Sequence, residues 1–191
     1  MPVPLLSNDF AYLQRVYSGY LALTFSNRHK WNLNTGLRLE QTVIDGDFQT
    51  TQTKLSRRYR NLIPSAMLSK GFGIHTLKIS YTQRIQRPQI CSLNPWVNQS
   101  DPKNIMTGNP GLNPELSHAT EVAHSLTTKK GLSLNSALYW RQTNNAIEYL
   151  SRLCSHHQTQ NIGQRATYGF NINLSGDVVK DLNLNVGTET L

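Results

Sequence analysis

Apolar and polar side chains alternate along most of this chain, and the alternation recurs about eight times. The clearest segment covers residues 31–40, WNLNTGLRLE, in which tryptophan and leucine alternate with asparagine, glycine, arginine and glutamate. Successive side chains of a β-strand point to opposite faces, so each segment predicts a strand with one apolar and one polar face. The predicted strands span residues 10–25, 31–40, 59–70, 77–84, 117–127, 132–141, 168–175 and 182–187.

The connections between these predicted strands alternate in length. Short turns follow the first, third, fifth and seventh strands, whereas longer polar segments follow the second, fourth and sixth, including residues 45–58 and 151–161. In an antiparallel up-and-down array, this alternation places every long loop at one end and every tight turn at the other. Outer-membrane barrels have this arrangement, and a tilted strand of about 9–11 residues suffices to cross a bilayer.

The alternation alone does not decide which face of the sheet meets water. In a soluble barrel the leucine-rich face points inward, whereas in a membrane barrel it points to lipid and the polar face lines the lumen. The polar faces carry a lumen-like mixture of glycine, asparagine and arginine, which favours the membrane arrangement. Large aromatic residues near strand ends are typical of membrane interfaces and favour it too: Trp31, Tyr81, Trp140 and Tyr168. We therefore expect Leu37, Leu134 and Phe170 to point outward rather than into a compact core.

Pro64 interrupts the third predicted strand. Proline has no backbone N–H to donate to a β-ladder and is confined to edges, strand starts and bulges. We therefore expect Pro64 to occupy an edge-like, bulged or strand-start position.

The composition suits a β-structure and gives little support to other classes. Only 16% of the residues are charged, and the net charge is +8. Apart from residues 57–60 and 129–130 the basic residues are scattered, so we do not expect a nucleic-acid partner. The sequence contains no strained serine nucleophile motif and no phosphate-binding glycine loop, so we expect no enzyme activity and no cofactor.

A set of motifs around the longest loop carries a family resemblance. Tyr81, Arg84, Arg87 and Pro88 end one strand, Leu-Asn-Pro follows at 93–95, GNPGLNPE occupies 108–115, and Glu121 lies in the next strand. This pattern resembles the C-terminal barrel of TonB-dependent outer-membrane receptors, and most closely the outer membrane protein beta-barrel family. The resemblance covers most of the chain. It implies an all-β fold: an antiparallel up-and-down transmembrane β-barrel segment of about eight strands.

The resemblance also implies a domain organisation. Family barrels have about 22 strands and are closed by an N-terminal plug, so residues 1–191 would form a partial barrel domain of about a third of that. The chain has no signal-peptide pattern and no apolar stretch of about 20 residues that would span as a helix. We therefore expect an internal or C-terminal piece of a longer receptor, whose plug and TonB-contacting motif lie outside this sequence.

The function implied by the resemblance is uptake of a scarce ligand, such as an iron chelate, cobalamin or a glycan, across the bacterial outer membrane. The expected partners are outer-membrane lipid, the TonB complex through the plug, and a small-molecule or glycan ligand. We predict ligand contacts in the loops at 89–114 and 151–160. On the lumen side we predict contacts at Arg38, Lys78 and Arg141.

The longest loops contain further candidate chemistry. Cys91 and Cys154 fall in loops at the same end, and both a disulfide and two unpaired thiols are consistent with the sequence. Cys154 is followed by His156 and His157, but adjacent histidines point in different directions and no fourth ligand has a suitable spacing. We therefore predict no metal site at this cluster.

The GNPGLNPE segment has its own physical interpretation. Repeated Asn-Pro and Pro-Gly steps favour turns and extended conformations, so we expect an ordered chain of turns that folds back before Glu115. Arg84 and Arg87 on the incoming strand are candidates to pair with Glu115 and Glu121 on the outgoing one.

Two other functions are compatible with the same pattern. A soluble β-barrel carrier of a small apolar ligand would explain the lack of an export signal. A small structural outer-membrane barrel would share the fold but transport nothing.

Overall fold

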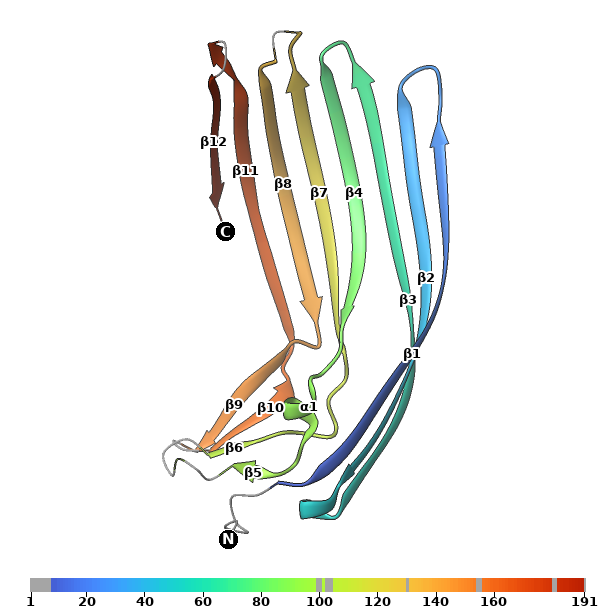
Figure 1. Cartoon of the computed structure of the whole chain (residues 1–191), viewed down its shortest axis with the longest axis vertical. Coiled ribbons are helices and arrows are strands. Elements are labelled where there is room, and N and C mark those ends of the chain that lie inside the picture. Colours follow the sequence, from blue (N-terminus) through green and yellow to red (C-terminus); the bar gives the residue numbers. More distant parts are fainter. Residues whose placement is uncertain are drawn as a thin grey trace.

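A computed structural model describes residues 8–98, 101, 105–129, 131–153, 156–179 and 182–190. For residues 151–153, 156, 177–179, 182, 183 and 189 it describes the backbone alone. The elements are β1 (Phe10–Ser26), β2 (Trp31–Phe48), η1 (Gln49–Thr51), β3 (Thr53–Phe72), β4 (His75–Gln86), α1 (Ile90–Leu93), β5 (Val97–Asn98), β6 (Ile105–Thr107), β7 (Glu115–Thr127), β8 (Ser133–Asn144), β9 (Ile147–Leu153), β10 (His156–Asn161), β11 (Gln164–Val179) and β12 (Leu182–Thr190). Figure 1 shows long strands that run side by side, with short turns at one end and a group of shorter elements, α1, β5, β6, β9 and β10, at the other.

The main sheet has eight strands in the order β1-β2-β3-β4-β7-β8-β11-β12, and every neighbouring pair is antiparallel. The predicted up-and-down array of about eight strands is therefore confirmed. In the described chain, β1 pairs only with β2 and β12 pairs only with β11, so the sheet is open at both edges. An open edge exposes unpaired backbone groups, which lipid cannot satisfy.

The register places apolar residues of neighbouring strands in common rows. Ile79 lies opposite Val122, Val122 opposite Leu138, and Leu138 opposite Phe170. This apolar face remains uncovered: Leu37 is 44% exposed, Leu138 64% and Phe170 40%, and Leu134 is half-buried. The predicted outward orientation of these side chains is confirmed, because they do not meet in a compact core.

An aromatic row crosses the same face. Tyr81 and Trp140 both lie opposite Thr120 of β7, and Tyr168 lies opposite Trp140. Toward the loop end, the next row is polar, with Gln83, His118 and Gln142 in register. The strands continue beyond the aromatic row, so the expectation that Tyr81, Trp140 and Tyr168 sit near strand ends was wrong, whereas Trp31 is the first residue of β2.

The short turns gather at one end of the sheet, at the top of Figure 1. In the turn between β1 and β2, the Asn27 side-chain oxygen accepts hydrogen bonds from the backbone N–H groups of His29 and Trp31, at 3.0 and 3.1 Å. Gly73, in the turn between β3 and β4, has φ of 59°, a conformation that glycine adopts without strain. Asparagine and glycine therefore supply the turn geometry that the alternating strands need.

Two predicted loops are largely strand. The segment 45–58 belongs to β2 and β3, which are joined only by η1 and Gln52. Much of 151–161 belongs to β9 and β10, which join β5 and β6 in a second, four-stranded sheet with a parallel β6–β10 pair. Lys54, Ser56 and Arg58 of β3 are polar and exposed, and β10 is polar along its whole length, so the apolar alternation that reveals a membrane-crossing strand is missing. Among the residues that the structure describes, none of the helical segments has the length and hydropathy of a transmembrane span.

Pro64 marks a seam in the main sheet. The β3–β4 ladder covers only Ser65–Phe72 of β3, so Pro64 is the first residue beyond it, while β3 remains paired with β2. The expected edge-like position of Pro64 is confirmed on the β4 side. Figure 1 shows the lower parts of β1, β2 and β3 diverging from β4.

Beyond its ladder with β4, β3 continues as residues 53–64, which pair with residues 37–48 of β2 and form a loop-end extension of the sheet. This extension contributes to the only buried cluster of apolar residues found in the described residues. Ile44, Phe48 and Leu55 lie on the polar-face side of the sheet and pack against Leu93 and Leu112 from the long loop. Fully burying such a side chain contributes about 1.5–3 kcal/mol. The long loop is therefore folded over the inner face of the extension. Burial in this region raises the pKa of the Tyr12 phenol, and the neighbouring Tyr59 phenol adds to the rise.

Candidate functional site

The three predicted lumen cations all lie on the polar face of the main sheet. Arg38 on β2, Lys78 on β4 and Arg141 on β8 share this face by register parity, opposite to Leu37, Ile79 and Leu138 on the apolar face. Their placement on the lumen side therefore agrees with the sequence pattern. Their contact with a ligand stays a prediction, and their electrostatic environments differ.

Arg38 belongs to a network around a buried carboxylate. One Glu40 oxygen accepts a hydrogen bond from Arg38 Nε at 2.7 Å, and the other pairs with Arg87. Arg87 Nε also donates to Thr42 Oγ1 at 3.0 Å. The Glu40 side chain is only 8% exposed and that of Arg87 20%, so this charge pair is largely shielded from water. Because Arg87 directly precedes the long loop, the network fixes the point where the loop leaves the sheet.

Lys78 is also neutralised, because its Nζ lies 2.7 Å from a Glu121 carboxylate oxygen on β7. The predicted pairing of Arg84 and Arg87 with Glu115 and Glu121 is therefore wrong. Arg87 pairs with Glu40, which lies 47 positions away in the chain and cannot be matched to it by spacing. Glu115 accepts a hydrogen bond from the backbone N–H of Ile147 at 2.6 Å.

Arg84 and Arg141 line one cleft of about 210 Å³ on the polar face, together with residues of β4, β7 and β8. Among the described residues, neither arginine has a hydrogen bond or a carboxylate partner. Arg84 also lines a groove of about 500 Å³ at the β3–β4 seam, in which Arg38 is a further lining residue. The structure thus places Arg84, which was not a predicted ligand contact, between Arg38 and Arg141.

The GNPGLNPE segment is ordered by backbone contacts with the Leu-Asn-Pro segment before it. Gly108 N donates to Asn94 O at 2.9 Å, and Asn109 N donates to Ser92 O at 2.7 Å. A Cβ at Gly108 would collide with the carbonyl oxygens of Asn94 and Ser92, so only glycine permits this approach. The Arg57 guanidinium donates to Leu112 O at 2.6 Å. The expected ordered chain of turns is therefore present in the described part of the segment.

Asn161 joins the long loop to the segment after β8. Its side-chain oxygen accepts from Asn113 N at 2.8 Å, and its side-chain nitrogen donates to Asn113 O and Asn145 O at 3.0 and 2.7 Å. Thr159 makes a second link, because its hydroxyl donates to Ser92 O at 3.0 Å. The two loop segments predicted to contact ligand are therefore held together by direct hydrogen bonds.

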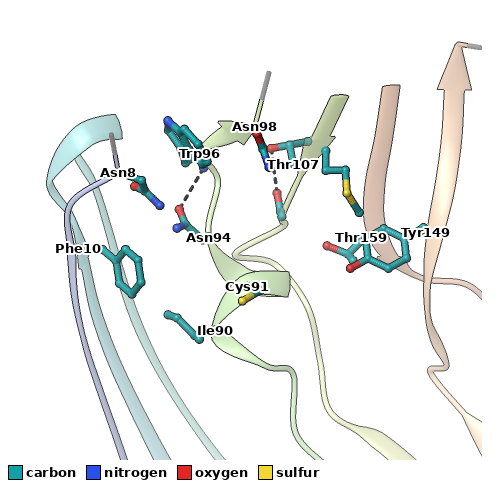
Figure 2. Close-up of a pocket in the computed structure, with 12 residues that line it drawn as sticks. Asn8, Phe10, Ile90, Cys91, Asn94, Trp96, Asn98, Thr107, Tyr149 and Thr159 are labelled. Carbon is teal, nitrogen blue, oxygen red and sulfur yellow. Dashed lines mark hydrogen bonds between the residues drawn. The ribbon is translucent and has the colours of Figure 1, made fainter. Parts of the chain in front are cut away.

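A cavity of about 280 Å³ lies among these segments (Figure 2). Its walls come from the start of β1, from α1, from the β5–β6 region and from β9 and β10. Aromatic and apolar side chains supply much of the wall, with asparagine and threonine between them: Phe10, Ile90, Trp96, Met106, Tyr149, Asn8, Asn94, Asn98, Thr107 and Thr159. Asn94 Oδ1 accepts from Trp96 N at 3.1 Å, which fixes this turn beside the cavity. Mixed apolar and polar linings of this kind are typical of small-molecule sites.

The cysteine and histidine candidates are only partly described. Cys91 is exposed and lines the cavity, whereas Cys154 lies outside the described residues, so their pairing stays a prediction. The histidine cluster beside Cys154 includes His156, of which the structure describes the backbone alone. Among the described side chains, no group of three or more histidine, cysteine or acidic residues is placed to hold a metal ion.

Taken together, these features define a class of protein. The sheet has an uncovered apolar face with an aromatic row, an opposite face with charged and amide side chains, tight turns at one end and interlocked loops at the other. This is a segment of the wall of a transmembrane β-barrel. The chain matches the outer membrane protein beta-barrel family over residues 1–191, and it belongs to that family. It is a protein of the bacterial outer membrane.

Solved structures with similar folds come from outer-membrane receptors and transporters. The hemophore receptor HasR of Serratia marcescens, solved as a double mutant with its hemophore HasA and heme, has a TM-score of 0.75 and 16% identity. The FrpB iron transporter of Neisseria meningitidis has a TM-score of 0.69 and 15% identity, and the copper transporter OprC has 0.73 and 14%. At these identities the similarity shows the fold alone. Comparison with curated proteins gave no significant match.

This chain spans about a third or less of each of those proteins. The matches cover 86%, 95% and 92% of this chain but only 32%, 26% and 28% of HasR, FrpB and OprC, respectively. The expected partial-barrel organisation of residues 1–191 stays a prediction, to which this difference in length corresponds.

Proposed function

We propose that this chain forms part of the barrel wall of a TonB-dependent outer-membrane receptor that takes up a scarce ligand. The observation that carries the proposal is the match of nearly the whole chain to receptor and transporter barrels named for heme, iron and copper. The interlocked loops around a cavity support it, because capture requires a site on the outer side of the membrane. An iron chelate, heme, a copper complex, a cobalamin and a glycan are the ligand classes to test.

In this proposal, the partners of the intact receptor are outer-membrane lipid on the apolar face and the TonB complex through a plug encoded elsewhere in the gene. The long loops and β9–β10 hold the ligand at the mouth, and polar-face side chains line its route. The soluble-carrier alternative is disfavoured because a carrier would bury Leu37, Leu138 and Phe170 around its ligand, whereas they are exposed. A structural barrel that transports nothing is separated from the receptor by the experiment below.

The test is uptake by cells that carry the intact gene, a deletion of it, or a deletion of the TonB homologue. Each strain is grown under limitation for iron or copper and given radiolabelled heme, a ferric siderophore mixture, copper, cobalamin or an oligosaccharide. We expect both deletions to abolish uptake of one ligand class. Unchanged uptake of every class in the gene deletion would contradict the receptor function and favour the structural barrel.

A further inference from the structure

The cations of the polar face differ in whether a protein carboxylate neutralises them. Arg38 and Arg87 share Glu40, and Lys78 pairs with Glu121. Arg84 and Arg141 are left, because within the described part of the chain neither has a carboxylate or hydrogen-bond partner. Both side chains are exposed on the wall of the same cleft. The two arginines therefore place positive charge on the cleft wall that no described carboxylate pairs with.

The sheet register brings these two arginines to one place. They lie on β4 and β8, which flank β7, with Arg84 opposite Ser117 and Arg141 opposite Ala119. Adjacent strands are about 4.8 Å apart, so the two flanking backbones are about 10 Å apart, within reach of two arginine side chains around a small anion. Ser117 and Ala119 have short side chains, which leave the space between the arginines open. The cleft volume is about 210 Å³.

We propose that Arg84 and Arg141 form a binding site for a carboxylate group on the lumen wall. A guanidinium presents a planar fork of N–H donors that matches the two oxygens of a carboxylate, and such paired hydrogen bonds are stronger than neutral ones. The hydroxyls of Ser80 and Thr82 line the same cleft and offer further donors, whereas the Ser117 hydroxyl shares a hydrogen bond with Thr143 Oγ1 at 2.8 Å. Glu121 also lines it, but its pairing with Lys78 keeps its charge from cancelling that of the arginines.

This site rests on the proposed function and deepens it. It names the chemical group, a carboxylate, that binds to the lumen wall, either on the transported ligand or on another part of the receptor. Two sources would present the same carboxylate. One is a diffusible anionic ligand that passes along the wall. The other is an acidic side chain from a part of the receptor outside this chain. The experiment separates these sources and does not use transport as its readout, so a failure here is distinguishable from a failure of uptake.

The experiment measures the rate at which phenylglyoxal modifies each arginine of the intact, detergent-purified receptor, by mass spectrometry. Citrate is the carboxylate probe. The reaction is run with and without citrate at low salt, about 0.1 M KCl, and at high salt, about 1 M KCl, because exposed charges are screened weakly in the first and strongly in the second. Arg28, in the turn between β1 and β2, is the internal control. For a diffusible ligand, citrate at about ten times its half-protecting concentration should slow modification of Arg84 and Arg141 together about tenfold.

Each outcome decides the proposal. Joint protection by citrate, with Arg28 unaffected, supports the site with a diffusible source. If Arg84 and Arg141 are both protected at low salt without citrate, and the protection is lost at high salt, the result supports the site with a carboxylate supplied by the receptor itself. Equal reactivity in all conditions, protection of one arginine alone, or no reaction at any salt concentration overturns it. In the first case R84Q should abolish citrate protection of Arg141, and R141Q that of Arg84, whereas R28Q should leave both protected.

Discussion

The buried Glu40 carboxylate gives the sharpest prediction about stability. Glu40→Gln removes the charge that neutralises Arg87 and Arg38, while the amide oxygen retains one acceptor. Breaking a buried pair by removing one partner costs about 3–5 kcal/mol. Because the Arg38 side chain is half exposed and remains solvated, we expect the lower end, about 3 kcal/mol. The cost should fall on the long loop, since Arg87 directly precedes it.

Amide hydrogen exchange in the intact receptor measures this loss locally. The reporters are Gly108 N–H and Asn109 N–H, which donate to carbonyl oxygens at 2.9 and 2.7 Å. A loss of about 3 kcal/mol corresponds to exchange about 100-fold faster, because each 1.4 kcal/mol is about tenfold. Glu121→Gln is the matched control: it breaks a pair whose side chains are both more than a third exposed, so it should cost only about 0–1 kcal/mol. Equal effects of the two substitutions would refute the reasoning.

Three further predictions test the loops and the apolar face. Gly108→Ala should cost about 1–3 kcal/mol through its backbone clash, whereas Gly19→Ala, which has open space around it, should leave the melting temperature nearly unchanged; equal shifts would contradict the close approach. Leu138→Arg should destabilise the receptor refolded in lipid vesicles by about 2–4 kcal/mol, and Ala137→Arg on the polar face much less, as measured by denaturant titration; the reverse order would exchange the lipid and lumen faces. Asn161→Ala removes three hydrogen bonds worth about 1 kcal/mol each, and should speed amide exchange at Asn113; unchanged exchange would show that the link does not stabilise the loop.

The sequence was informative wherever one face of a strand meets an apolar environment. Between Trp31 and Leu39 the alternation is regular except at Thr35, because one side of the strand is largely apolar and uncovered and the other is polar. The same reasoning located the main strands and the direction of Leu37 and Phe170. The register of Val122 with Ile79 continues this apolar face across β7.

The sequence was less informative beyond the aromatic row. There the outer face of the strands carries residues such as Arg58 and Arg60, so neither face of the strand is uniformly apolar. The sequence of such a strand looks like that of a polar loop. The buried cluster around Phe48 and Leu93 depends on a loop that returns across a strand far away in the chain. The Glu40–Arg87 contact is equally distant. No spacing rule signals such contacts, although the Arg-Pro step at the strand end did mark where the loop begins.

The glycine and asparagine contacts among the loops have a consequence for recognition. Ser92 receives hydrogen bonds from both Asn109 and Thr159, and Asn161 bridges two further segments. The walls of the cavity in Figure 2 are therefore ordered in advance of any encounter. A molecule that docks there loses little binding energy to immobilising the chain, and discrimination between molecules depends on fit to a preset shape.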